Sequence, residues 1–242
     1  MIRPRSYSNV GAMVLPILQL LLQFLLASAR TPSPCPCTDA ALCQPMRTPR
    51  PAREVMVPLD MNSPAYGHGG IAGTFMGDWR AQIEWDTVTI LVMATSSEYG
   101  LRTGGQPSSS DWEVYCHAHS KGVRVLPTVA GGGDPAKAMN VTDPTSRTEW
   151  VAKTTATMVA LGLDGIMFDL EWTEDQQGSR GISAMLAETA ASFRVAQPHS
   201  LVGVWTDTNS SDVMLRGYDV PAIGRSVDFI SLMAYGMSQC AW

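Results

Sequence analysis

The sequence contains little charge and no basic cluster. Charged residues make up 16% of the 242 residues, the formal net charge is −5, and the 17 lysines and arginines are scattered along the chain. A protein that binds nucleic acid needs a basic surface to neutralise phosphates. We therefore do not expect nucleic acid to be a partner.

After the first thirty residues, no hydrophobic run is long enough to cross a bilayer. The first thirty contain one shorter run, residues 14–26, which follows Arg3 and Arg5 and ends in Ala27-Ser28-Ala29. A positive start, a short apolar centre and a small-x-small end are typical of a secretory signal peptide. A membrane anchor is the alternative, but the run is shorter than the ~20 residues of a spanning helix. We predict a signal peptide at 1–29, no stable membrane anchor, and delivery to a lysosome-like compartment or the exterior.

Cysteine is scarce and odd in number. Cys35, Cys37 and Cys43 crowd the start of the mature chain, whereas Cys116 and Cys240 stand alone. A secretory route favours disulfides, and one thiol then stays free or pairs outside this sequence. A zinc site at the first three cysteines is the alternative, although no histidine lies near them. We expect no metal and no cofactor.

Two sequences match the pattern of N-glycosylation acceptors, at residues 140–142 and 209–211. The pattern matters here because the chain is predicted to be secreted. We therefore expect a glycoprotein.

The domain organisation follows from a change in pattern near residue 54. Residues 30–53 are rich in proline, threonine and arginine, which predicts an extended leader held by cysteines. From 54 to 242, β-favouring apolar runs alternate with helical patterns. Strands are expected at 54–59, 88–94, 123–129, 163–172, 201–206 and 229–235, and helices at 112–120, 144–161 and 182–193.

Alternating strands and helices predict a parallel sheet, and strand ends rich in glycine and charge favour a (β/α)8 TIM-type barrel. Six of the eight strands are expected, so the barrel is incomplete and we expect the chain to be truncated after Trp242. A doubly wound open sheet is the alternative. It is disfavoured because no Gly-x-Gly-x-x-Gly turn joins a strand to a helix.

The strand expected at 163–172 carries acids on one face. Alternation directs Met167, Asp169 and Glu171 to one side and the apolar Ile166 and Phe168 to the other. Like charges in a poorly solvated place cost free energy and disfavour ionisation of at least one acid, which suits general-acid chemistry. A structural acid pair, satisfied by an arginine or by backbone amides, is the alternative.

The nonapeptide at 163–171 resembles the Asp-Gly-x-Asp-x-Asp-x-Glu signature of family 18 glycoside hydrolases, the chitinases and their relatives. Cys35-Pro36-Cys37 with Leu42-Cys43, residues 115–122 and Met233-Ala234-Tyr235 support the resemblance, which spans Cys35 to the end of the sequence.

The resemblance implies retaining hydrolysis of N-acetylglucosamine β-1,4 linkages by a substrate-assisted route. The substrate would be an oligosaccharide of the chitin or chitobiose type, or one derived from N-linked glycans. Glu171 would be the general acid, Asp169 would hold the substrate's 2-acetamido group, and Tyr235 would donate a hydrogen bond to it. Asp164 would be a structural turn residue. We expect a monomer.

Trp172, Trp205 and Met233 are predicted to bind substrate. The tryptophans could stack on sugar rings, or they could be core aromatics. His117 and His119 form a His-x-His pair, but helix positions two apart do not face each other, which argues against a metal site.

Some positions depart from the family pattern. Met167 stands where the family has Asp or Asn, so it can neither share a proton with Asp169 nor orient it. Gly236 stands where an Asp follows Met-x-Tyr, and residues 130–133 only approximate Ser-x-Gly-Gly. These departures favour an alternative, a catalytically weakened lectin-like protein that binds chitin or its oligosaccharides. The presence of Glu171 favours the enzyme.

Overall fold

The computed structural model describes residues 35–48, 50–60, 79–94, 107–130, 140–169, 176–207 and 219–233. The predicted signal peptide lies outside these residues and stays a prediction. No helix in the described ranges is both long and apolar enough to cross a membrane.

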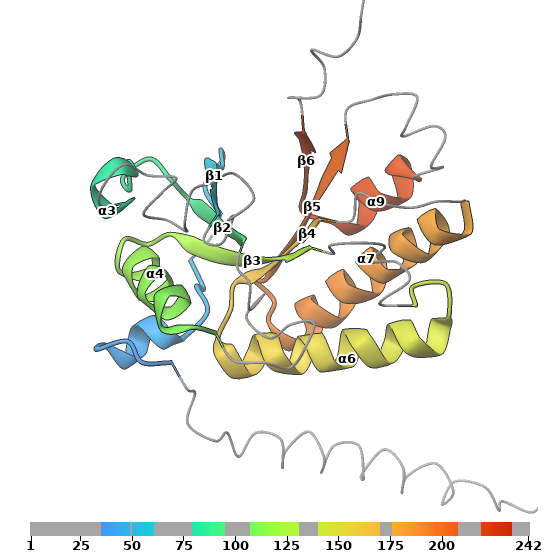
Figure 1. Ribbon diagram of the computed structural model, residues 1–242, viewed down its shortest axis with the longest axis horizontal. Helices are drawn as coiled ribbons and strands as arrows, with labels where there is room; N and C mark the ends of the chain where they lie inside the picture. The colour runs from blue at the N-terminus through green and yellow to red at the C-terminus, as the bar shows by residue number, and fades with distance from the viewer. Residues whose placement is uncertain are drawn as a thin grey trace, which may run out of the picture. The chain divides into compact units, whose positions relative to one another are not determined.

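The described residues form one sheet of six parallel strands, in the order in which they occur along the chain (Figure 1). Each strand pairs in parallel with the next. The sheet curls as part of a (β/α)8 barrel, which confirms the predicted fold class. The strands are β1 (Met56–Asp60), β2 (Ile90–Ala94), β3 (Arg124–Ala130), β4 (Gly165–Asp169), β5 (Leu201–Asp207) and β6 (Phe229–Met233).

The helices that follow β1 connect the strands and cover one face of the sheet (Figure 1). A large apolar cluster joins this outer face to the helices, and a smaller one lies on the inner face. The helices are η1 (Ala40–Cys43, a 3-10 helix), α3 (Trp79–Gln82), α4 (Ser109–Ser120), α6 (Pro144–Leu161), α7 (Gln176–Ala196) and α9 (Val220–Ser226).

Local sequence signals explain where the longer helices begin and end. α4 begins with a capping box, in which the Asp111 amide donates to Ser108 Oγ and the Ser108 amide donates to the Asp111 carboxylate. α6 begins after the cap residue Asp143 and ends at Gly162, whose φ of 68° favours glycine. Both boundaries of α6 agree with the sequence prediction. α9 was missed, although its cap Asp219 and the proline in its first turn are recognisable signals.

The alternation predicted for β4 is confirmed. Ile166 and Phe168 belong to the outer cluster beneath the helices, whereas Met167 belongs to the inner cluster. Asp169 follows Met167 on the inner face, because successive side chains of a strand alternate.

The carboxylate of Asp164, just before β4, holds several distant segments together. Its Oδ1 accepts a hydrogen bond from the Met46 amide at 2.7 Å, and its Oδ2 accepts from the Val125 amide at 2.8 Å. His119 Nε2 lies 2.8 Å from the same Oδ2, and His119 Nδ1 lies 2.7 Å from the Leu42 carbonyl oxygen. His119 thus contacts the Leu42 carbonyl and the Asp164 carboxylate through its two ring nitrogens, which joins α4 to the leader and to the start of β4. This network confirms that Asp164 has a structural role.

Tyr115 packs against His119, with ring centroids 3.9 Å apart. Its hydroxyl donates to the Gly162 carbonyl oxygen at 2.7 Å. Burial, and secondarily the negative charge of Asp164, raise the pKa of Tyr115 above its usual range. The phenol therefore stays protonated and keeps its hydrogen bond at the end of α6.

Two disulfides fasten the leader. Cys35 pairs with Cys43, and Cys37 pairs with Cys116 in α4. The expectation of disulfides is confirmed. The leader is not wholly extended, because it contains the 3-10 helix η1, which is capped by Asp39. Cys240 lies outside the described residues.

Replacing Asp164 with Asn should lower the free energy of unfolding by about 1.5–3 kcal/mol, because one carboxylate oxygen becomes an NH2 donor that faces a backbone N–H donor. Urea denaturation of the full chain measures the change. The matched control is Asp86→Asn at an exposed position, which should stay within about 0.5 kcal/mol of the parent. Equal midpoints for the two variants would contradict the structural role of Asp164.

Alkaline pH should destabilise the protein through Tyr115. Its folded-state pKa is raised, so its contribution is fully present below the ordinary value of 10.0 and is lost as pH rises above that value. Urea midpoints measured on both sides of about pH 10 should fall more steeply for the parent than for Tyr115→Phe. Parallel pH profiles for the two proteins would show that Tyr115 does not carry this dependence.

Candidate active site at the carboxyl ends of the strands

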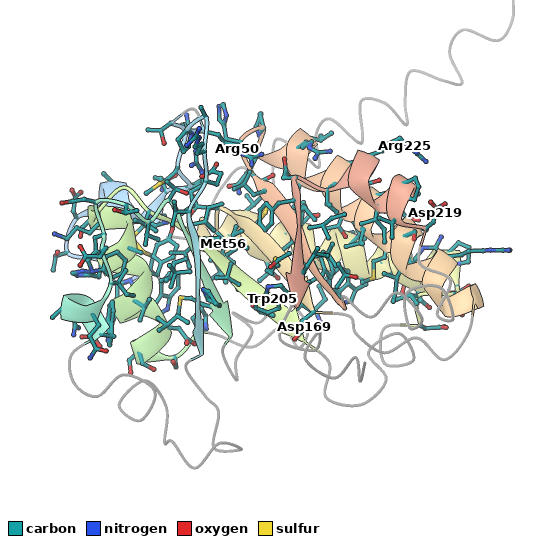
Figure 2. All side chains as sticks on the ribbon, turned by 90° about the horizontal axis from the view of Figure 1, so that it is seen from above. Arg50, Met56, Asp169, Trp205, Asp219 and Arg225 are labelled. Carbon is teal, nitrogen blue, oxygen red and sulfur yellow. A yellow bond between two sulfur atoms is a disulfide. The ribbon has the colours of Figure 1, made fainter. Side chains whose placement is uncertain are left out.

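Asp169 and Trp205 lie side by side on the inner face, where β4 and β5 end. They are Cα partners in the parallel register, and both side chains are partly buried. Figure 2 shows the two residues together at one end of the sheet. Ala130 of β3 and Ser231 of β6 continue the same row on either side. A carboxylate beside an indole can bind a polar group of a ligand while the aromatic ring contacts its apolar face.

The structure describes part of the predicted site, and the roles of the residues that it describes stay predictions. It brings Asp169 and Trp205 together, and it places the backbone of Met233 at the end of β6, paired with Asp207. Glu171, Trp172 and Tyr235 lie outside the described residues. Their roles therefore stay predictions.

The row beneath Asp169 is almost entirely apolar. Thr128, Met167, Gly203 and Phe229 are successive partners across β3 to β6. Met167 is fully buried. A Cβ atom at Gly203 would lie 2.7 Å from Met167 Sδ and 2.2 Å from the Phe229 ring. The thioether and the ring therefore occupy the space above a glycine, and Met167 fits an apolar layer rather than an acidic one.

Sequence reasoning missed two polar positions near this site. Thr128 supplies the one hydroxyl in the row of Met167, and that hydroxyl is buried without a hydrogen-bond partner among the described residues. Asp207 is the last residue of β5, next to Met233 of β6. The register of β3 with β4 was needed to find Thr128.

The two alternatives involving metal do not fit this geometry. Cys35, Cys37 and Cys43, the alternative zinc ligands, are each bonded in a disulfide, so none is the thiolate that binds zinc. The same holds for Cys116, whose sulfur lies within 4.8 Å of those of Cys35 and Cys37. His117 packs edge-on against Trp79 and Trp85, whereas His119 contacts Asp164. The two histidines therefore serve different contacts.

The sequence profile described as glycosyl hydrolases family 18 matches residues 86–242. Di-N-acetylchitobiase of Mus musculus is 30% identical over 230 residues, which are 94% of this chain and 53% of the relative. The counterpart from Rattus norvegicus is 28% identical over 93% of this chain and 53% of its own length. The chain thus spans about half the length of these curated relatives.

Solved structures agree on the fold. The catalytic domain 2 of a Group II chitinase from Ostrinia furnacalis, solved in complex with (NAG)5, matches with a TM-score of 0.58 at 17% identity, over 76% of this chain and 50% of that one. At this level of identity the likeness concerns the fold alone.

Gly203→Ala tests the inner row. The added methyl group collides with Phe229 and Met167, so we expect a loss of about 1–3 kcal/mol in the free energy of unfolding. Gly224→Ala in α9 is the matched control, because its new methyl group would lie 4.0 Å from Ile230 Cδ1 of β6, an ordinary contact. In a double-mutant cycle, Phe229→Leu should recover part of the loss. Additive effects would show that these side chains do not interlock.

Proposed function

The chain belongs to family 18 of the glycosyl hydrolases, and we propose that the protein cleaves β-1,4 linkages of N-acetylglucosamine in oligosaccharides of the chitin or chitobiose type. The observation that carries the proposal is the position of Asp169, on the inner face at the carboxyl end of β4 and beside Trp205. Active sites of barrels of this type lie at this end of the strands.

The proposed route is retaining and substrate-assisted. Glu171 protonates the glycosidic oxygen as the bond to the leaving sugar breaks, while the carbonyl oxygen of the substrate's own 2-acetamido group attacks the anomeric carbon. Asp169 holds that acetamido group, and its negative charge disfavours ionisation of Glu171. Tyr235 donates a hydrogen bond to the acetamido oxygen. Water then attacks the anomeric carbon on the face that the leaving sugar occupied, opposite the acetamido oxygen, and gives a proton to Glu171. The bond between the anomeric carbon and the acetamido oxygen breaks, so the product keeps its configuration.

Substrate binding falls to the aromatic and apolar side chains near these acids. Trp205 supports this role by its place next to Asp169 and on the inner cluster. Trp172 and Met233 complete the proposed set. The oligosaccharides bound by chitinases of the same fold agree with this substrate class.

A lectin-like protein is the second candidate, and Met167 favours it. A proton-sharing acid beneath Asp169 is replaced here by a buried thioether in an apolar row. A chitinase-like agglutinin from Robinia pseudoacacia matches the fold with a TM-score of 0.50 at 17% identity, over 65% of this chain and 52% of that one. A protein of this kind would bind the oligosaccharide and leave it intact.

We also propose that the protein enters the secretory pathway, for a lysosome-like compartment or the exterior. The apolar run at 14–26 and the two disulfides support this route.

Hydrolysis of a fluorogenic chitobioside tests the enzymatic proposal. Glu171→Gln keeps the shape of the side chain but removes the transferable proton, so turnover should fall by about 10²–10⁴-fold while binding of the oligosaccharide persists. Glu149→Gln, at an exposed position of α6, is the matched control and should be unchanged. Binding without turnover in the unmutated chain would establish the lectin instead. Unchanged turnover in Glu171→Gln would show that Glu171 is not the general acid.

A further inference from the structure

The turn before α6 holds an Asn-x-Thr sequence that the proposed function does not use. Asn140, Val141 and Thr142 lie just ahead of the cap residue Asp143. Asn-x-Ser/Thr is the acceptor pattern for N-linked oligosaccharides, provided that the asparagine reaches the surface. The second such sequence, at 209–211, lies outside the described residues.

The middle residue of this sequence is buried, whereas the residues on either side of it are exposed. Val141 is fully buried, whereas Asn140 and Thr142 are exposed. The Val141 carbonyl oxygen accepts a hydrogen bond from Arg147 Nη1 at 2.8 Å, and a Cβ atom at Gly181 of α7 would lie 2.6 Å from that oxygen. The backbone is therefore held against α6 and α7, and this anchoring presents the two polar side chains to solvent.

The asparagine side chain is itself only weakly engaged. Asn140 Nδ2 donates to Ser146 Oγ at 3.3 Å, and Thr142 Oγ1 donates to Asn140 Oδ1 at 3.5 Å, both long for hydrogen bonds. The φ of Asn140 is 46°, in the left-handed region that asparagine and aspartate tolerate. Modification of Nδ2 thus removes no contact on which the fold depends.

The topology places this turn at the same edge of the sheet as the candidate site. It lies between the carboxyl end of β3 and the start of α6, and α6 belongs to the outer helical layer. Asn140 therefore precedes a helix of the outer layer, whereas Asp169 and Trp205 lie on the inner face.

We propose that Asn140 is an N-glycosylation site. The donor is an oligosaccharide on a lipid pyrophosphate. A bond forms between Nδ2 and the anomeric carbon, the bond from that carbon to the phosphate oxygen breaks, the lipid pyrophosphate leaves, and Nδ2 gives up one proton. The inference rests on the proposed secretory route and is independent of the proposed hydrolysis.

Translation of the full chain in the presence of microsomes tests the site. We expect a protease-protected product whose mass falls on treatment with peptide:N-glycosidase F. Asn140→Asp and Thr142→Ala should each remove one glycan, whereas Thr142→Ser should retain it. Asp is the matched replacement, because it tolerates the same φ; Asn209→Asp separately reports the other acceptor.

A protected chain whose glycan number is unaffected by Asn140→Asp would overturn the proposal. A chain that stays unprotected would overturn it as well, because Asn140 would then never meet the donor. Loss of the glycan in Asn140→Asp but not in Thr142→Ala would also contradict acceptor recognition. Equal urea midpoints for unglycosylated parent and Asn140→Asp would show that the variant folds normally.

Discussion

The structure depends on a buried carboxylate at the foot of β4. Asp164 accepts hydrogen bonds from the backbone of the leader and of β3, and its carboxylate lies 2.8 Å from His119 Nε2 of α4. A buried charge is tolerated only when its partners are in place, so these segments must assemble around it together. The same few residues fix where β4 starts. The start of β4 in turn sets which of its side chains face inward, because a shift of one residue would exchange the two faces.

The inner face is built in rows, and each row has its own chemistry. Asp169 and Trp205 form a polar and aromatic row at the strand ends. In the row below, the side chains of Met167 and Phe229 occupy the space that Gly203 leaves open. An acid at position 167 would replace a fully buried thioether in an apolar cluster that includes the Phe229 ring. Met167 therefore fits two neighbouring residues of its row, Gly203 and Phe229. Whether the protein is an enzyme or a lectin, its Asp169 lies next to an apolar row.

Much of the fold could be predicted from the sequence, since six apolar runs and the caps at Ser108, Asp143 and Gly162 are local signals. The alternation in β4 also correctly placed Asp169. What could not be predicted depends on long-range register: Met46 lies 118 residues from Asp164, and His119 lies 45 residues from it. Five cysteines allow several pairings, so the partner of Cys37 needed the structure. Thr128 could be assigned to the row of Met167 only from the pairing of β3 with β4.

The bond between Cys37 and Cys116 closes a covalent loop in which the paired residues are 79 positions apart, and β1 and β2 lie inside it. A single peptide-bond cleavage anywhere within this loop would leave both fragments attached to each other. The first two strands would then stay covalently linked to the part of the chain that contains β3. Refolding of the cleaved chain would remain an intramolecular process. Such a link suits a protein that meets proteases, because damage to the loop does not become dissociation.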